Sequence, residues 1–366
     1  MIIQFFFGKR LTSRAGSDKI KTNTKARLII WEEIIIHEEK VRLVDSQIQQ
    51  LMEMVKEREI EQVYFVACGG SLATLQPGKY TLQRETDKVF AESYNAAEFV
   101  ADPPVRLNEK TLVVLNSQSG GTAETVAAAR LAAERGALTT AFTTAPGSAI
   151  EKTVEQIIYY YDNPADPFPA VLTIFPEVVK LTWALLDTLN GTSCLGEVNE
   201  AMLRLQGTMD KACEQYLDAA RKFAAEYRHE DLIYTITAGL NSCVGYVMTN
   251  CLVMESLWKH SSPIHAGEFF HGACEAVDNT TTVLVLMGMG KTRSLEERVV
   301  KFLLRKTKKL IVLDANALDM SEYPAYLWEI ASTLVLNRLC ALYIDEMSYV
   351  MGHPVSSRRY MGVEKY

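Results

Sequence analysis

Residues 111–137 read TLVVLNSQSGGTAETVAAARLAAERGA, and this stretch decides the fold class. Its first five residues form a short run of β-branched and aliphatic side chains, which is typical of a strand buried on both faces of a parallel sheet. A glycine-containing loop follows, and then a segment of strong helix formers that ends at Gly136, a suitable C-cap. The stretch therefore predicts a strand, a tight loop and a helix, the repeating unit of an α/β sheet.

The same unit recurs in the second half of the chain. Three pairs of segments share one offset or nearly so: EQVYFVACGGS (61–71) with DLIYTITAGLN (231–241), TLVVLNSQSGGTAET (111–125) with TTVLVLMGMGKTRSLEE (281–297), and ALTTAFT (137–143) with KLIVLDA (309–315). Repetition at a fixed offset indicates an internal duplication. We therefore expect an α/β protein of two tandem domains, each a parallel sheet sandwiched by helices.

Length and composition agree with two domains and exclude some classes of protein. The chain has 366 residues, too many for one ordinary core. We expect an N-terminal extension (1–45, partly disordered or helical), domains at 46–200 and 201–355, and a C-terminal tail at 356–366. A net charge of −7 argues against a nucleic-acid binder, which needs a basic face. No uninterrupted apolar stretch approaches the ~20 residues of a membrane span.

Cysteine usage bears on metal and redox chemistry. The seven cysteines include no CxxC pair, so neither a disulfide framework nor a structural zinc site is expected. We expect a cytoplasmic protein that binds no metal.

Two loops at predicted strand ends suit an anion. They read CGGS (68–71) and NSQSGGT (116–122), with small residues, hydroxyl donors and a following helix N-terminus. Four side chains in the second loop are able to ring one phosphate: Ser117, Gln118, Ser119 and Thr122. The alternative is that both loops are plain turns. The matching loops of the second copy carry fewer hydroxyls, which favours one phosphate pocket per chain, and no nucleoside-triphosphate P-loop motif is present.

Ionisable residues also occur in and beside an apolar segment near 255–275. Glu255 lies in a run with helical character, where burial would raise the pKa of a carboxylate and suit it to act as a general base. The alternatives are an exposed helix edge, or pairing with Lys259 at i+4. His271 sits in a glycine-flanked segment, either as an acid–base group or as an ordinary loop residue. His265 and Glu268 are equally ambiguous, and their spacing is not that of a metal site.

Taken together, these motifs resemble the sugar isomerase (SIS) superfamily, including the isomerase half of glucosamine-6-phosphate synthase. A closer similarity is to the bacterial fructosamine-6-phosphate deglycases, through YFVACGGS (64–71), YNAAEFVADPP (94–104), IHAGEFFHG (264–272) and RRYMG (358–362). The resemblance runs from about residue 50 to the end of the chain. It implies tandem SIS domains, a hexose 6-phosphate ligand, no metal or organic cofactor, and a homodimer or dimer of dimers with active sites near the interface.

The resemblance also implies roles for individual residues. Glu255 matches the carboxylate that moves a proton between C1 and C2 of the open-chain sugar, and His271 matches the imidazole associated with ring opening. The phosphate-site positions are Ser71, Ser117, Gln118, Ser119 and Thr122. Weaker substrate-binding expectations fall on Gly70, Glu268, His265 and Lys365, and Lys365 is displaced relative to the synthase's tail lysine.

The implied activity is hydrolysis of a fructosamine 6-phosphate to glucose 6-phosphate and a free amine. Two alternatives stay open: an aldose–ketose isomerase or aminosugar-phosphate deaminase on the same scaffold, and a non-catalytic sugar-phosphate sensor. The glutaminase half of the synthase is missing from this chain.

Overall fold

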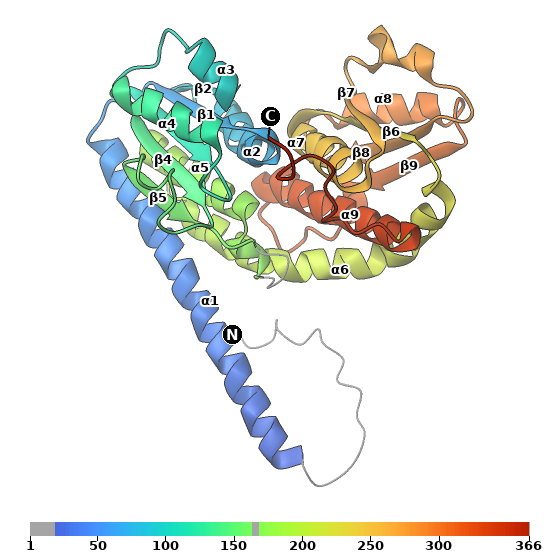
Figure 1. Ribbon diagram of the computed structural model, residues 1–366, viewed down its shortest axis with the longest axis horizontal. Coiled ribbons are helices and arrows are strands. Elements are labelled where there is room, and N and C mark those ends of the chain that lie inside the picture. The colour runs from blue at the N-terminus through green and yellow to red at the C-terminus, as the bar shows by residue number, and fades with distance from the viewer. Residues whose placement is uncertain (1–18, 163–167, 366) are drawn as a thin grey trace.

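The computed structural model describes residues 19–162 and 168–365, with the backbone alone for 19–34. Figure 1 shows two α/β bodies side by side, joined by long helices. The first body and the helix that precedes it consist of α1 (Lys19–Lys56), β1 (Gln62–Ala67), α2 (Gly69–Glu85), β2 (Phe90–Asn95), α3 (Ala96–Ala101), β3 (Thr111–Asn116), α4 (Ala123–Glu134), β4 (Leu138–Thr143), β5 (Gln156–Tyr159) and α5 (Ile174–Asn190). The second consists of α6 (Leu195–Tyr227), β6 (Leu232–Thr237), α7 (Ser242–Tyr246), η3 (Val247–Ser256), β7 (His260–His265), β8 (Thr282–Met287), α8 (Arg293–Leu303), β9 (Lys309–Asp314) and α9 (Trp328–Met351).

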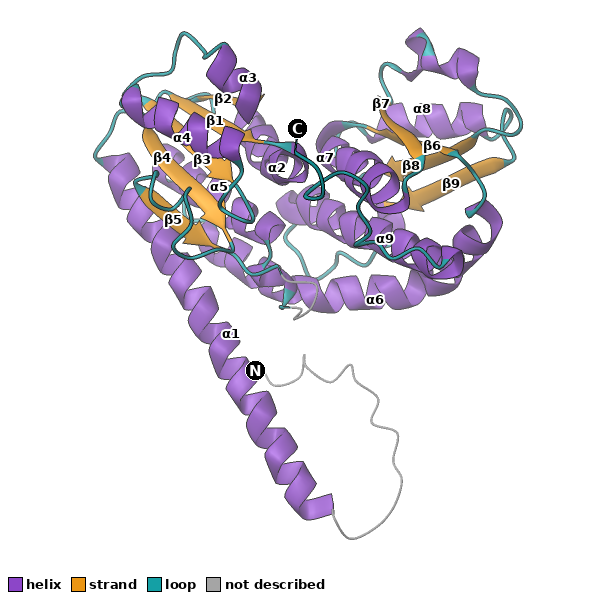
Figure 2. Ribbon diagram, viewed as in Figure 1, coloured by secondary structure: helices purple, strands orange, loops and turns teal. Residues whose placement is uncertain are grey.

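Each body contains one parallel sheet, as the α/β prediction requires. The strand orders are β2-β1-β3-β4-β5 and β7-β6-β8-β9, and every pair is parallel. All six residues of β1, β3 and β8 are buried, because helices cover both faces of each sheet (Figure 2). The two tandem α/β domains inferred from the repeat are therefore confirmed.

The helices form distinct layers. In the first domain α1, α2 and α5 pack on one face of the sheet, and α3 and α4 pack on the other. In the second domain α6, α7 and α9 form one layer, and α8 with the segment after β7 forms the other. The helices α6 and α9 pack against each other along the base of the molecule (Figure 1).

Two long helices bear on the sequence expectations. The stretch Ala325–Met351, which contains α9, is apolar and long enough to cross a membrane by length and composition, yet 72% of its most apolar window is buried inside the protein. Its apolar side chains belong to the core of the second domain. Of the expected extension, residues 1–18 lie outside the described part of the chain, and the rest forms the larger part of α1, whose N-terminal portion extends away from the body of the molecule in Figure 1.

Candidate active site

Two helix N-termini meet at the carboxyl ends of β1 and β3, which are neighbours in the first sheet. The helix α2 begins at Gly69 and α4 begins at Ala123, and neither start has a side-chain cap. The first N–H groups of a helix have no partner inside it, and the helix dipole is positive at that end. The place where the two N-termini converge therefore favours an anion such as a phosphate.

Glycine is required in this cradle at two positions. Gly69 and Gly120 have φ angles of +57° and +64°, which side-chain-bearing residues rarely adopt. A Cβ atom at Gly120 would also lie 2.2 Å from the Oγ atom of Ser148. The loop 116–122 therefore depends on Gly120 for both its backbone conformation and its packing.

The predicted phosphate-site residues divide into two groups. Ser71, Gln118, Ser119 and Thr122 line the cavity in front of the cradle. Ser117 does not, because it ends up buried directly behind Thr122. Its Oγ donates to Thr122 Oγ1 at 3.0 Å and accepts from the Thr122 backbone N–H at 3.4 Å. The structure therefore places Ser117 as a support for Thr122 and not as part of the cavity wall.

In the second domain, a carboxyl group of the protein itself lies at the position that matches the phosphate cradle of the first domain. Glu296, which is fully buried on α8, accepts the backbone N–H of Ala238 at 2.9 Å and that of Gly288 at 2.7 Å. These two N–H groups lie just beyond β6 and β8, at the repeat positions of Cys68 and Gln118. A carboxyl group of the protein itself thus engages these N–H groups in the second domain, whereas Cys68 and Gln118 of the first domain line the cavity, which is a structural reason to expect one phosphate pocket per chain.

This buried carboxylate predicts a pH-dependent stability. Burial raises the pKa of Glu296 from 4.5 to about 7, although the two N–H donors act in the opposite direction. Because the folded pKa lies above the unfolded one, the free energy of unfolding falls as pH rises from about 4.5 to about 7. A shift of this size corresponds to roughly 3 kcal/mol.

The Glu296→Gln variant, which cannot ionise, should be less stable than the wild type in acid but lose less stability over the same pH range. Urea unfolding at several pH values measures both slopes. Equal slopes for the two proteins would contradict the role given to Glu296.

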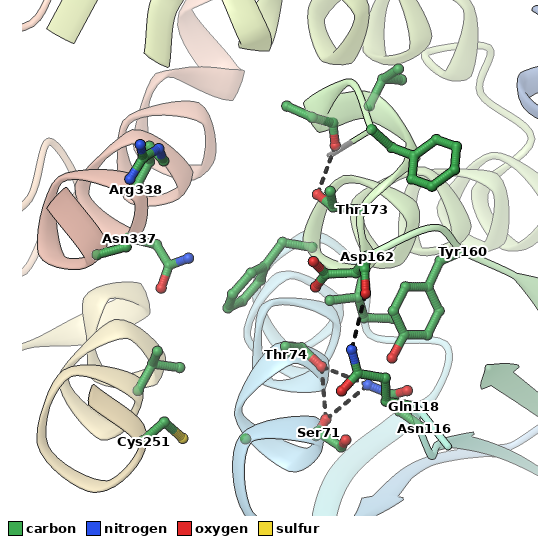
Figure 3. A pocket seen from close by; sticks show the side chains of 18 of the residues that line it. Ser71, Thr74, Asn116, Gln118, Tyr160, Asp162, Thr173, Cys251, Asn337 and Arg338 are labelled. Atoms are coloured by element: carbon green, nitrogen blue, oxygen red, sulfur yellow. Dashed lines mark hydrogen bonds between the residues drawn. The ribbon is translucent and has the colours of Figure 1, made fainter. Parts of the chain in front are cut away.

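The cavity in front of the cradle has a volume of 2310 Å³ and lies between the two domains. Figure 3 shows Ser71 and Gln118 of the first domain on one side, and Cys251, Asn337 and Arg338 of the second on the other. The Gln118 side chain is oriented by donating from Nε2 to the backbone oxygen of Asp162 at 3.2 Å. The wall opposite the phosphate cradle is therefore built by η3 and α9.

Glu255 enters this cavity from η3, which confirms the helical character expected of this segment and is a π-helix. π-Helical turns are rare and occur frequently at functional sites. The domains touch here: a Cβ atom at Gly70, which also lines the cavity, would lie 3.2 Å from Cys251 Sγ. Glu255 is thereby presented across the cavity from the N-terminus of α2.

The charge partner of Glu255 is not Lys259. Lys259 Nζ donates instead to the backbone oxygens of Arg228 and Glu230, at 2.8 and 2.7 Å. Glu255 Oε1 lies 2.6 Å from Nη2 of Arg358 in the C-terminal tail, and the side chains are 25% and 30% exposed. The alternative of an i+4 pair is therefore wrong, and the carboxylate faces the cavity with one cation beside it.

The neighbouring thiol stays protonated at neutral pH. Burial raises the pKa of Cys251 to about 11, and the negative charge of Glu255 adds to this effect. Cys251 is therefore not a thiolate nucleophile at neutral pH.

The remaining predicted residues lie elsewhere on the surface of the chain. His265, Glu268 and His271 are exposed on and after β7, and none of them belongs to the described cavity wall. His271 ends a short 3₁₀ turn, Phe269–His271, and His265 Nδ1 accepts the Gly267 N–H at 3.1 Å. Lys365 is exposed and also does not line the cavity. A single chain therefore does not bring Glu255 and His271 to one cavity.

The sequence did not predict the role of Arg358, which pairs with Glu255, or of three residues of the cavity wall. Arg358 carried a signal, since it lies in the motif RRYMG. Asp162, Asn337 and Arg338 carried none, because they lie in a loop and on a core helix.

Comparisons with known proteins fit this geometry. The SIS domain family model matches residues 58–185. The fructosamine deglycase FrlB of Bacillus subtilis (strain 168) is 38% identical over 88% of this chain and 98% of its own length. The fructoselysine 6-phosphate deglycase of Escherichia coli (strain K12) is 28% identical over 91% of this chain and 95% of its own. A Bacillus subtilis crystal structure assigned to the phosphosugar isomerases superposes with a TM-score of 0.86 at 37% identity, covering 90% of this chain and 100% of the other.

Proposed function

The chain belongs to the fructosamine deglycase family of SIS-domain proteins, and from this membership we propose that it hydrolyses a fructosamine 6-phosphate to glucose 6-phosphate and a free amine or amino acid. The observation that carries the proposal is the position of Glu255, which faces one cavity with an uncapped phosphate cradle on the opposite wall. An enzyme of this kind holds the substrate by its phosphate and moves one proton on carbon.

The phosphate group of the substrate is bound by the cradle of the first domain. The N-termini of α2 and α4 supply backbone N–H donors, and Ser71, Ser119 and Thr122 supply hydroxyls. All these donors are neutral, so the binding free energy comes from hydrogen bonds and helix dipoles. The sugar then extends from the cradle towards η3.

Glu255 carries the proton transfer once the sugar ring is open. It removes a proton from C1 of the open-chain ketosamine and gives an enaminol. Returning the proton to C2 leaves an aldimine at C1, and water hydrolyses the aldimine to the aldehyde of glucose 6-phosphate and the amine. The step conserves oxidation state overall, so positioning and one carboxylate suffice.

His271 assists ring opening from a second copy of the chain. It is exposed on the outer layer of the second domain, outside the cavity that Glu255 faces. An isologous dimer in which each copy extends its β7 edge over the other's cavity would complete both sites at once. The proposed enzyme is therefore a homodimer that works in the cytoplasm.

The decisive test is a panel of substrates. The protein is incubated with fructose-amino-acid 6-phosphates, glucose 6-phosphate is followed through a coupled dehydrogenase, and the released amine is measured separately. Equal amounts of both products from one panel member support the deglycase and name its amine. Interconversion of simple hexose or hexosamine 6-phosphates without turnover of any ketosamine would instead support the isomerase or deaminase alternative.

Loss of one hydroxyl from the cradle should weaken substrate binding specifically. Thr122→Val removes a donor that lines the cavity, and we expect KM to rise about tenfold with kcat little changed. Thr292→Val is the matched control, because Thr292 holds the same repeat position in the second domain. Steady-state kinetics of both variants checks this. An equal effect from Thr292→Val would assign the loss to general damage.

A further inference from the structure

The C-terminal tail, residues 352–365, forms part of the active-site wall. Met361 and Gly362 line the cavity together with Glu255. In Figure 1 the C-terminus lies above the space between the two domains, near α2 and α7. The tail therefore lies across the opening into which the substrate must fit.

One tail side chain reaches the proposed base itself. Arg358 Nη2 lies 2.6 Å from Glu255 Oε1, and both side chains are half-buried. The other end of the guanidinium is fixed by the tail's own backbone, since Nη1 donates to the carbonyl oxygens of Val355 at 2.8 Å and Ser357 at 2.9 Å. A planar fork held at both ends defines a direction for the carboxylate that it contacts.

The tail is anchored separately, a few residues beyond Glu255. The Arg359 guanidinium lies over the Trp258 ring at 4.2 Å, and the His353 ring packs edge-on against the same ring at 4.4 Å. Trp258 has a φ angle of +59°, which is unusual for a bulky residue. The surrounding contacts hold this strained backbone in place directly after η3.

We propose that Arg358 is a positioning residue that orients the Glu255 carboxylate for proton transfer, and that docking of the tail completes the active site. The contact is made through Oε1, and Glu255 also lines the cavity whose opposite wall carries the phosphate cradle. Arg358 should therefore affect the chemical step more than substrate binding. This inference rests on the proposed function, in which Glu255 moves the proton.

The test compares two variants that each remove one guanidinium from the tail. For Arg358→Ala we expect kcat to fall about 10²-fold, the scale of a misplaced catalytic group. KM should change less than about threefold, because the phosphate cradle is untouched. Arg359→Ala loosens the tail at Trp258 and leaves the contact with Glu255 in place, so kcat should fall much less. Added guanidinium ion should restore part of the activity of Arg358→Ala and none of that of Arg359→Ala.

Each outcome decides the matter. A selective, guanidinium-rescued loss of kcat in Arg358→Ala supports the positioning role. Equal losses in both variants would show that the tail acts only by docking, and a kcat that is unchanged or raised in Arg358→Ala would remove the role altogether. Failure of the proposed function is distinguishable, because the wild-type protein would then turn over no ketosamine phosphate in the same assay.

Discussion

Glu255→Gln should abolish most turnover while leaving the sugar phosphate bound. The amide keeps the size of the side chain but cannot accept a proton from C1, and a general base typically contributes about 10²–10⁴-fold to the rate. We expect kcat to fall by that factor. The phosphate cradle is built from other elements, α2 and α4, so binding of an open-chain analogue such as glucitol 6-phosphate should persist.

Two measurements check this expectation. Steady-state kinetics gives the loss of kcat, and calorimetry with the reduced analogue gives the dissociation constant. Glu226→Gln is a suitable control, since Glu226 is exposed on α6 and its nearest cation, Lys222, is 3.9 Å away. Near-full activity of Glu255→Gln with normal binding would show that the base has been assigned to the wrong residue.

Two inactive variants should restore activity when they share a dimer. His271→Ala and Glu255→Gln each lose most turnover alone, because every site in either homodimer lacks one of the two groups. In a mixed dimer, one site combines Glu255 of one copy with His271 of the other. Random mixing of equal amounts should therefore return about a quarter of the wild-type activity.

The experiment is co-expression of the two variants with different affinity tags, followed by isolation of the mixed dimer. The isolated mixed dimer should reach about half the wild-type activity, since one site of two is intact. Matched controls are the two homodimers purified in the same way. A mixed dimer that stays as inactive as its parents would place His271 either in its own chain's site or outside the reaction.

Much of the fold could be predicted from local sequence. The strands β1, β3, β6 and β8 were found because continuous apolar runs are typical of strands covered on both faces. The strand β7 was missed: its sequence HSSPIH is polar and contains Pro263, which a sheet tolerates at an edge such as this one. The π-helical winding of η3 was also missed, because an apolar run predicts helical character without specifying its hydrogen-bond pattern.

The candidate site, like the fold, could be predicted from the sequence only in part. Residues 68–71 and 116–122 could be assigned to one anion site from sequence, since parallel strands bring their carboxyl ends to one edge of the sheet. Ser117 could not be separated from Ser119 by residue type. Its position directly after β3 puts it behind the loop, and only the folded chain shows which hydroxyl faces the cavity.

By itself, then, the sequence determined the two duplicated α/β domains, the phosphate loop and the identity of Glu255 as an unusual carboxylate. These depend on periodicity, glycine placement and residue chemistry, which are properties of neighbours in the chain. Tertiary structure alone decided that Arg358 pairs with Glu255, that Glu296 fills the second domain's anion site, and that His271 lies outside its own chain's cavity. The Arg358–Glu255 and Glu296–Ala238 contacts join residues far apart in sequence, and no local pattern specifies which distant side chain makes such a contact.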